Sequence, residues 1–130
     1  LKVKRKKNVK FINDSFDLQN IYSKSHLFLG AAGTSVYEVS AQKIPGIFFK
    51  ISDNQETSHE SLEKMGQYFF LNKKYLQKKY SSEIFRLIQG IKNNYENIKF
   101  FTKNPLINID DKGVSRIVKN ILKIKWKIWN

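Results

Sequence analysis

The sequence predicts an α/β protein in which a Rossmann-like parallel sheet has helices on both faces. Two observations support this fold class. Short apolar runs alternate with amphipathic segments along the first half of the chain. These runs are mostly apolar and do not alternate regularly with polar residues, which is typical of parallel strands covered on both sides. The chain of 130 residues fits a single domain over residues 1–130, with a basic segment at 1–7 and a basic-aromatic tail at 123–130.

The first half of the chain should contain four strands with a helix after each of the first three. We expect the strands at Val9–Ile12, His26–Leu29, Ile47–Ile51 and Tyr68–Leu71. Capping side chains mark the first two helix starts, at Asp14 or Ser15 and at Thr34 or Ser35. The third helix should cover residues 56–65 and end at Gly66, because glycine is a common helix terminator.

The second half of the chain is predicted to be helical. Apolar residues recur every three or four positions from Ile84 to Tyr95, and Asn104-Pro105 interrupts the pattern. Asp110 and Asp111 then cap a final helix. Its apolar stripe consists of Val114, Ile117, Val118, Ile121 and Leu122, and Arg116, Lys119 and Lys123 lie opposite.

The net charge of +13 comes mainly from the two ends of the chain. Residues 1–10 hold six basic groups and residues 119–130 hold four, with no acid in either segment. Such ends are either solvated or attract anionic lipid or nucleic acid. A nucleic-acid-binding module needs stacking aromatics on a basic face, whereas the aromatics here fall mostly within the predicted strands. We therefore rank that module last and expect no specific nucleic-acid partner.

Composition also excludes several classes of site. The chain has no cysteine, which rules out disulfides and thiolate metal ligands and fits a reducing compartment. Its apolar runs are too short to span a bilayer. We expect a cytoplasmic protein without cofactor or metal, whose basic ends, including the C-terminal KIKWKIW, can reach an anionic membrane surface. His26 and His59 are interpreted as a structural and an exposed histidine, so no catalytic residue is assigned.

A candidate ligand site follows from the topology, since ligands of such sheets bind outside the carboxyl ends of the strands. Loops Asn13–Ser15, Gly30–Ser35 and Ser52–Gln55 all leave a predicted strand at that edge. The loop at Gly30–Ser35 enters a helix and is built of small residues, which lets a phosphate approach free N–H groups. Within it, Ala32, Gly33, Thr34 and Ser35 are the candidate diphosphate-binding residues. The alternative is a tight turn with a Ser/Thr cap.

Three polar residues on the same edge complete the candidate site. Glu38, one turn into the helix, can accept two ribose hydroxyls or can simply stabilise the helix N-terminus. Asn54 and Gln55 offer both donors and acceptors and suit sugar hydroxyls or a diphosphate. Their alternative role is an Asx turn with a helix cap.

These motifs resemble those of one known family. The segment SHLFLGAAGTSVYEVSAQKIPGIFFKISDNQETSHESLEKMGQYFFLN is similar to the C-terminal domain of GT-B-fold nucleotide-sugar enzymes. The resemblance is strongest to the hydrolases that release UDP from 2,4-diacetamido-2,4,6-trideoxy-altropyranose in pseudaminic acid synthesis, and extends to spore-coat polysaccharide enzymes. The segments NVKFINDSFDLQNIYSKS and LINIDDKGVSRIVKNIL resemble the flanking parts of that domain, so the likeness covers roughly residues 8–122.

The resemblance implies a fold, a ligand and a partner. The chain would be the C-terminal half of a GT-B fold that binds a UDP-sugar. Ala32–Ser35 would contact the diphosphate, Glu38 the ribose, and Asn54 and Gln55 the sugar or diphosphate. An N-terminal half, on the same parent chain or a separate subunit, would supply the water-activating histidine, which neither His26 nor His59 matches. The chain alone is therefore expected to be inactive, and a donor-binding subunit of a split GT-B glycosyltransferase is the alternative function.

Overall fold

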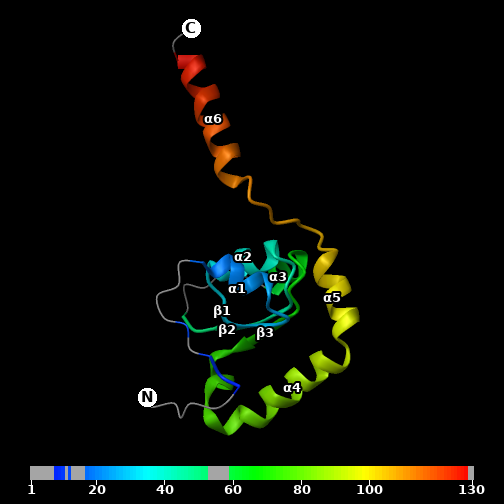
Figure 1. The fold of residues 1–130 in the computed structure, drawn as a ribbon. Coiled ribbons are helices and arrows are strands. Elements are labelled where there is room, and N and C mark those ends of the chain that lie inside the picture. The colour runs from blue at the N-terminus through cyan, green and yellow to red at the C-terminus, as the bar shows by residue number, and fades with distance from the viewer. Residues whose placement is uncertain (1–7, 11, 13–16, 53–58, 129–130) are drawn as a thin grey trace.

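The computed structural model describes residues 8–10, 12, 17–52 and 59–128 (Figure 1). Its described strands form a parallel sheet in the order β1-β2-β3, with β1 at Phe28–Ala31, β2 at Gly46–Lys50 and β3 at Phe69–Asn72. Helix α2 (Ser35–Ala41) connects β1 to β2, and α3 (His59–Lys64) lies between β2 and β3. The α/β class with a parallel sheet is confirmed.

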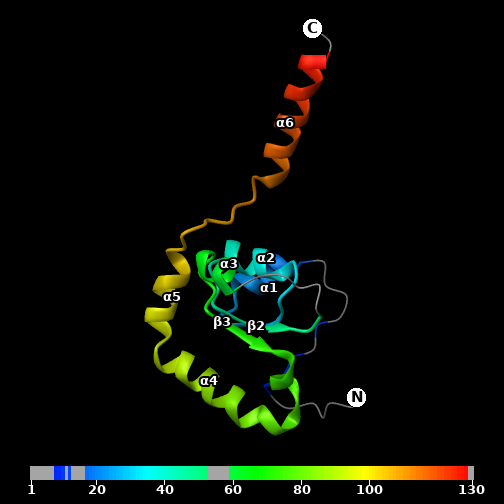
Figure 2. The same cartoon turned by 180° about the vertical axis from the view of Figure 1, so that it is seen from behind.

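One face of the sheet is covered by α2, α3 and the preceding helix α1 (Leu18–Ser23), as Figures 1 and 2 show from opposite sides. Phe48 of β2 is fully buried on this face. The buried cluster around it consists of Ala32, Val36, Val39, Ile44, Leu62 and Met65. The apolar side chains of α2 and α3 are therefore the ones that cover this face of the sheet.

The opposite face is covered mainly by α4 (Ser81–Asn93), which follows two short 3-10 helices, η1 (Lys73–Leu76) and η2 (Lys78–Tyr80). Helix α5 (Tyr95–Lys103) continues from α4 and runs beside the sheet (Figures 1 and 2). Successive residues of a strand point to opposite faces. The neighbours of Phe48 in β2 therefore pack here, in a second cluster formed by Ile47, Phe49 and Ile91 with Ile84, Leu87, Ile88 and Ile98 around them. Coverage of both faces, as predicted, is confirmed.

The structure differs from the predicted elements at the N-terminal end. Val9, Lys10 and Ile12 are exposed and have no regular secondary structure, so the predicted strand Val9–Ile12 is not found at its described positions; Phe11 lies outside them. Helix α1 begins at Leu18, and the Asp17 carboxylate caps it by accepting from Asn20 N–H at 3.0 Å. The predicted caps Asp14 and Ser15 lie outside the described residues.

The helix predicted through Ile84–Tyr95 is two helices that meet at Asn94. The Asn94 side chain donates to the Gly90 carbonyl at 2.9 Å, so it competes for a backbone group of the preceding turn. The apolar periodicity continues across this break, because α4 and α5 both pack against the sheet. Gly66 ends α3 as predicted, with a left-handed φ of 81°. A Cβ at Gly66 would lie 2.9 Å from the Thr102 carbonyl oxygen of α5, so glycine is also required for space.

A connector over residues 104–112 leads from α5 back across the α2–α3 layer. Ile107 N–H donates to the Lys64 carbonyl at 2.7 Å, the Lys43 ammonium donates to the Asn108 amide, and Ile109 packs against the first cluster. The final helix α6 (Gly113–Ile128) then projects away from the rest of the molecule (Figures 1 and 2). The segment predicted as a separate tail at 123–130 is thus a continuation of α6 as far as Ile128.

Candidate functional site

The candidate site lies at the edge where the carboxyl ends of β1 and β2 meet. The chain leaves β1 after Ala31, turns through Ala32–Thr34 and enters α2. Ala32 N–H donates to the Phe49 carbonyl of β2 at 2.9 Å, which holds the start of this loop beside the neighbouring strand. The structure therefore places this turn at the edge that the sequence predicted, but Gly30 and Ala31, which were predicted to be in the loop, are the last two residues of β1.

The small residues from the end of β1 through this loop have different roles. A Cβ at Gly30 would lie 2.5 Å from Cζ of the Phe28 ring, so this glycine makes room for a core side chain. Ala32 is 1% exposed and belongs to the core cluster. At Gly33, by contrast, no described heavy atom lies within 4 Å of an added Cβ. Gly33 is thus the small residue of the loop that leaves open space beside the backbone.

The N–H groups of Gly33, Thr34 and Ser35 have no acceptor among the described residues. The next two amides are paired, since Val36 N–H donates to the Gly33 carbonyl at 3.1 Å and Tyr37 N–H to the Thr34 carbonyl at 3.0 Å. Thr34 is the N-cap residue of α2, but its side chain makes no cap hydrogen bond. Free N–H groups at a helix start carry partial positive charge, so this loop presents donors to an anion.

Glu38 lies in the first turn of α2 and is exposed, with its carboxylate held from one side by Tyr22 of α1. The Tyr22 hydroxyl donates to Oε2 of Glu38 at 3.3 Å. Partial burial, and then the nearby Glu38 carboxylate, raise the pKa of Tyr22, so the phenol stays protonated and remains a donor. Nothing in the sequence pointed to Tyr22 as part of the candidate site, because its contact with Glu38 joins two separate helices.

A cavity of about 410 Å³ borders the same edge on the α4 side of the sheet. It lies between the ends of β1 and β2, the two 3-10 helices and the start of α4. Its polar lining comes from Gln77, Lys78 and Ser81, and its apolar lining includes Ala31, Phe49, Ile51, Tyr75 and Ile84. Sequence reasoning missed this cavity, although the run KKYLQKKY at residues 73–80, which combines cations and aromatics, is a visible signal.

No described contact links the other residues singled out in the sequence to this loop. Asn54 and Gln55 lie outside the described residues, so their contacts stay predictions. His26 precedes β1 at the opposite, amino edge, with its ring centroid 6.0 Å from that of Tyr95. His59 begins α3 and is exposed, and its ring packs edge-on against Phe70 at 4.7 Å. The contact of His26 agrees with the structural role expected for it, and His59 is exposed, as predicted.

Two absences hold for the part of the chain that the structure describes. It contains no group of three or more histidine, aspartate or glutamate side chains arranged to hold a metal ion. None of its helices combines the length and apolar content needed to cross a bilayer.

Comparison with protein-family models, with curated proteins and with solved structures returned no match.

Proposed function

We propose that this chain is the UDP-sugar-binding C-terminal half of a GT-B-type nucleotide-sugar hydrolase. The observation that carries the proposal is the sequence of groups at the carboxyl edge of the sheet. Three N–H donors at Gly33–Ser35 have no acceptor within the described part of the chain, and the exposed carboxylate of Glu38 follows one turn later. Donors for a diphosphate beside an acceptor for sugar hydroxyls are the two features that nucleoside diphosphate binding requires.

The spacing within α2 fits the dimensions of a nucleotide. Glu38 follows Ser35 by three residues, which corresponds to about 4.5 Å along a helix axis. In a nucleoside diphosphate the ribose is joined directly to the first phosphate, so its hydroxyls lie about one helical turn from the phosphate oxygens. A diphosphate at Gly33–Ser35 therefore brings the ribose to Glu38. Lys78, which lines the neighbouring cavity, adds positive charge at the same edge.

The reaction proposed for the parent enzyme is attack of water on the sugar carbon, with breakage of the bond to UDP. The leaving diphosphate gains negative charge, and preorganised N–H donors at Gly33–Ser35 stabilise it. The resemblance described above supports a diacetamido-trideoxy sugar as substrate. It also supports an N-terminal half, on the same chain or another, that closes over this edge and activates the water. The complete enzyme would act in the synthesis of a surface polysaccharide or flagellin glycan.

Hydrogen exchange with UDP and UMP tests the proposed diphosphate site. UDP should slow exchange of the amides over residues 30–38 more than UMP does, because the second phosphate reaches more of the loop donors. Amides of α5, on the other face of the sheet, provide an internal control and should not change. Equal protection by the two nucleotides would contradict a diphosphate site, and no protection by either would remove nucleotide binding from the proposal.

A further inference from the structure

Helix α6 has an apolar side that no other described part of the molecule covers. The side chains on this side are between 49% and 74% exposed: Val114, Ile117, Val118, Ile121, Leu122 and Ile124. Helix α4 has a comparable stripe, but Ile84, Leu87, Ile88 and Ile91 pack against the sheet. A contiguous exposed apolar surface of this kind marks an interaction site.

The opposite side of α6 is cationic. Arg116, Lys119 and Lys123 fall within a narrow arc of the helix, since successive residues are rotated by about 100°. From Lys112 to Asn130 the sequence contains six basic residues and no acidic one. The partner of α6 must therefore combine an apolar surface with negative charge along its border.

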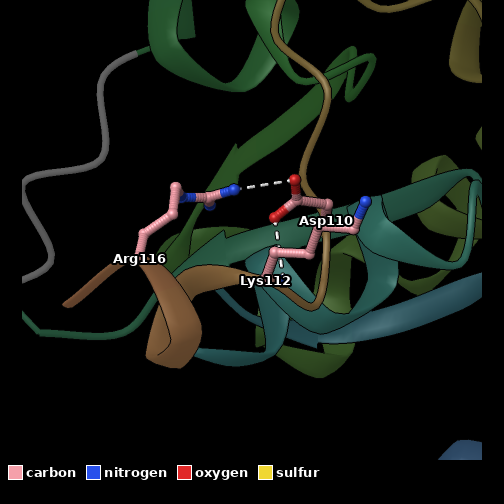
Figure 3. Close-up of polar contacts among 3 residues, drawn as sticks. All are labelled: Asp110, Lys112 and Arg116. Atoms are coloured by element: carbon pink, nitrogen blue, oxygen red, sulfur yellow. Dashed lines mark hydrogen bonds and ion pairs between the residues drawn. The ribbon is translucent and has the colours of Figure 1, made fainter. Parts of the chain in front are cut away.

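The start of α6 is fixed to the rest of the protein. Ile109 packs against the first core cluster, three residues before Lys112. The Asp110 carboxylate accepts from Lys112 N–H at 3.0 Å and from the Arg116 guanidinium at 2.8 Å, which ties the connector to the first turn of the helix (Figure 3). The connector itself is held at the ends of α2 and α3 away from the Gly33–Ser35 loop, through Lys43 and Lys64. The connector that leads into α6 is thus held at a distance from the candidate site.

We propose that α6 lies in the plane of an anionic lipid surface, with its apolar side in the acyl boundary and its cations at the headgroups. A broad apolar side, a cationic polar side and modest mean hydropathy are the features of helices that bind membrane interfaces. Each lysine or arginine near such a surface adds favourable electrostatic energy. This inference is independent of the proposed nucleotide site.

Two other occupants fit the observations less well. A coiled coil with a second copy would use a narrow seam, whereas Val118 and Leu122 widen the apolar side beyond it. It would also bring two cationic helices together without an acidic residue to pair them. A protein partner would need an acidic border around its groove, and the experiment below separates this case from lipid.

Vesicle binding of the full chain tests the proposal. Both tryptophans, Trp126 and Trp129, lie at the C-terminal end of the sequence, so tryptophan fluorescence reports only on that end. We expect the chain to sediment with phosphatidylglycerol vesicles but not with phosphatidylcholine vesicles, with a blue shift of the emission. High salt should weaken the binding, because screening reduces the attraction between lysines and headgroups.

Two double variants and one control variant test whether the apolar side and the cations of α6 both bind the lipid. Replacing Ile117 and Ile121 together by serine should lower vesicle partitioning by at least about tenfold, since each loses apolar surface that the lipid would bury. Lys119→Glu with Lys123→Glu should have a similar effect through charge. Leu106→Ser in the connector, where the leucine is 86% exposed, should bind like the parent chain.

Three outcomes would overturn the proposal. The folded chain could fail to bind anionic vesicles, which would assign the apolar side of α6 to a protein partner. The serine double variant could bind as well as the parent, which would leave charge alone as the cause. The parent chain could form a dimer in sedimentation equilibrium that the serine double variant lacks, which would assign this side to a second copy.

Discussion

Gly30, in β1, and Gly33, in the loop that follows it, lie three residues apart. Substitution of Gly30 should affect folding and not binding, and substitution of Gly33 should affect binding and not folding. Gly30→Ala places a methyl group 2.5 Å from Cζ and 2.8 Å from Cε1 of the Phe28 ring. Gly33→Val adds its methyl groups where no described atom lies within 4 Å of Cβ. Gly33 also has no left-handed φ, so an L-residue is tolerated there without backbone strain.

The structure sets the magnitude of the first change. The Phe28 ring cannot move freely, because its centroid is 5.4 Å from that of Phe48 and 6.0 Å from that of Tyr22. Forcing extra volume into such packing costs about 1–3 kcal/mol. For a domain of this size each kcal/mol lowers Tm by about 4 °C, so Gly30→Ala should melt about 4–12 °C below the parent. Gly33→Val should change stability by at most about 0.5 kcal/mol.

The loss of UDP affinity should be large for Gly33→Val and small for Gly30→Ala. Valine at position 33 covers N–H donors proposed to hold the diphosphate, so its affinity for UDP should fall by about tenfold or more, equivalent to about 1.4 kcal/mol. Gly30→Ala should bind UDP like the parent at temperatures where it is folded. Thermal melting followed by circular dichroism and titration calorimetry with UDP measure the two effects. Parent-like UDP affinity in the valine variant would refute a diphosphate site at this loop, and a melting loss equal to that of Gly30→Ala would refute the open space at Gly33.

Two further predictions concern charged side chains. Glu38→Ala should weaken UDP binding by about tenfold with nearly unchanged thermal stability, because hydrogen bonds to charged groups contribute about 1.5–3 kcal/mol. The matched control is Glu96→Ala, which removes a first-turn carboxylate from α5. A large fall in the melting temperature of Glu38→Ala would instead assign this residue to helix stabilisation. Hydrogen bonds from the Arg116 guanidinium and, to a lesser extent, from Lys112 N–H lower the pKa of Asp110 below its ordinary value of 3.8. The ionised carboxylate therefore stabilises the start of α6 above pH 3.8, and this stabilisation is lost as the pH falls through the lowered pKa. A carboxyl NMR titration of Asp110 should therefore show a rise of its pKa in Arg116→Gln, and an unchanged value would mean that the pair in Figure 3 does not persist in solution.

The alternation of strands and helices in the first half was predictable because each element carries its own signal. The uninterrupted apolar residues Ile47-Phe48-Phe49 predicted a strand covered on both faces, and β2 is that strand. The predicted strand at Val9–Ile12 has a weaker signal, since its apolar residues are interrupted by Lys10. Strand propensity in four residues is readily overridden by tertiary context.

The candidate site was predictable only in part. The rule that ligand loops follow the carboxyl ends of parallel strands located Gly33–Ser35 and Glu38 on one edge, where the structure has them. The distinction between Gly30, which accommodates Phe28, and Gly33, which faces open space, depends on ring positions that no spacing reveals. The hydrogen bond from Tyr22 to Glu38 joins residues sixteen positions apart, and it likewise follows from the packing of α1 against α2.

The comparison of α4 with α6 shows the limit of periodicity as a predictor. Both segments have apolar residues at three- and four-residue spacing, and both are helices of the expected kind. The pattern states that one side of the helix is apolar, but it contains no information about what covers that side. For α4 the sheet covers it, since Ile91 is only 3% exposed, whereas Ile117 of α6 is 61% exposed. An apolar stripe of this extent has no role in an isolated, fully solvated helix, so a partner must cover it. The experiments with anionic vesicles and with the Ile117 and Ile121 substitutions are designed to identify that partner.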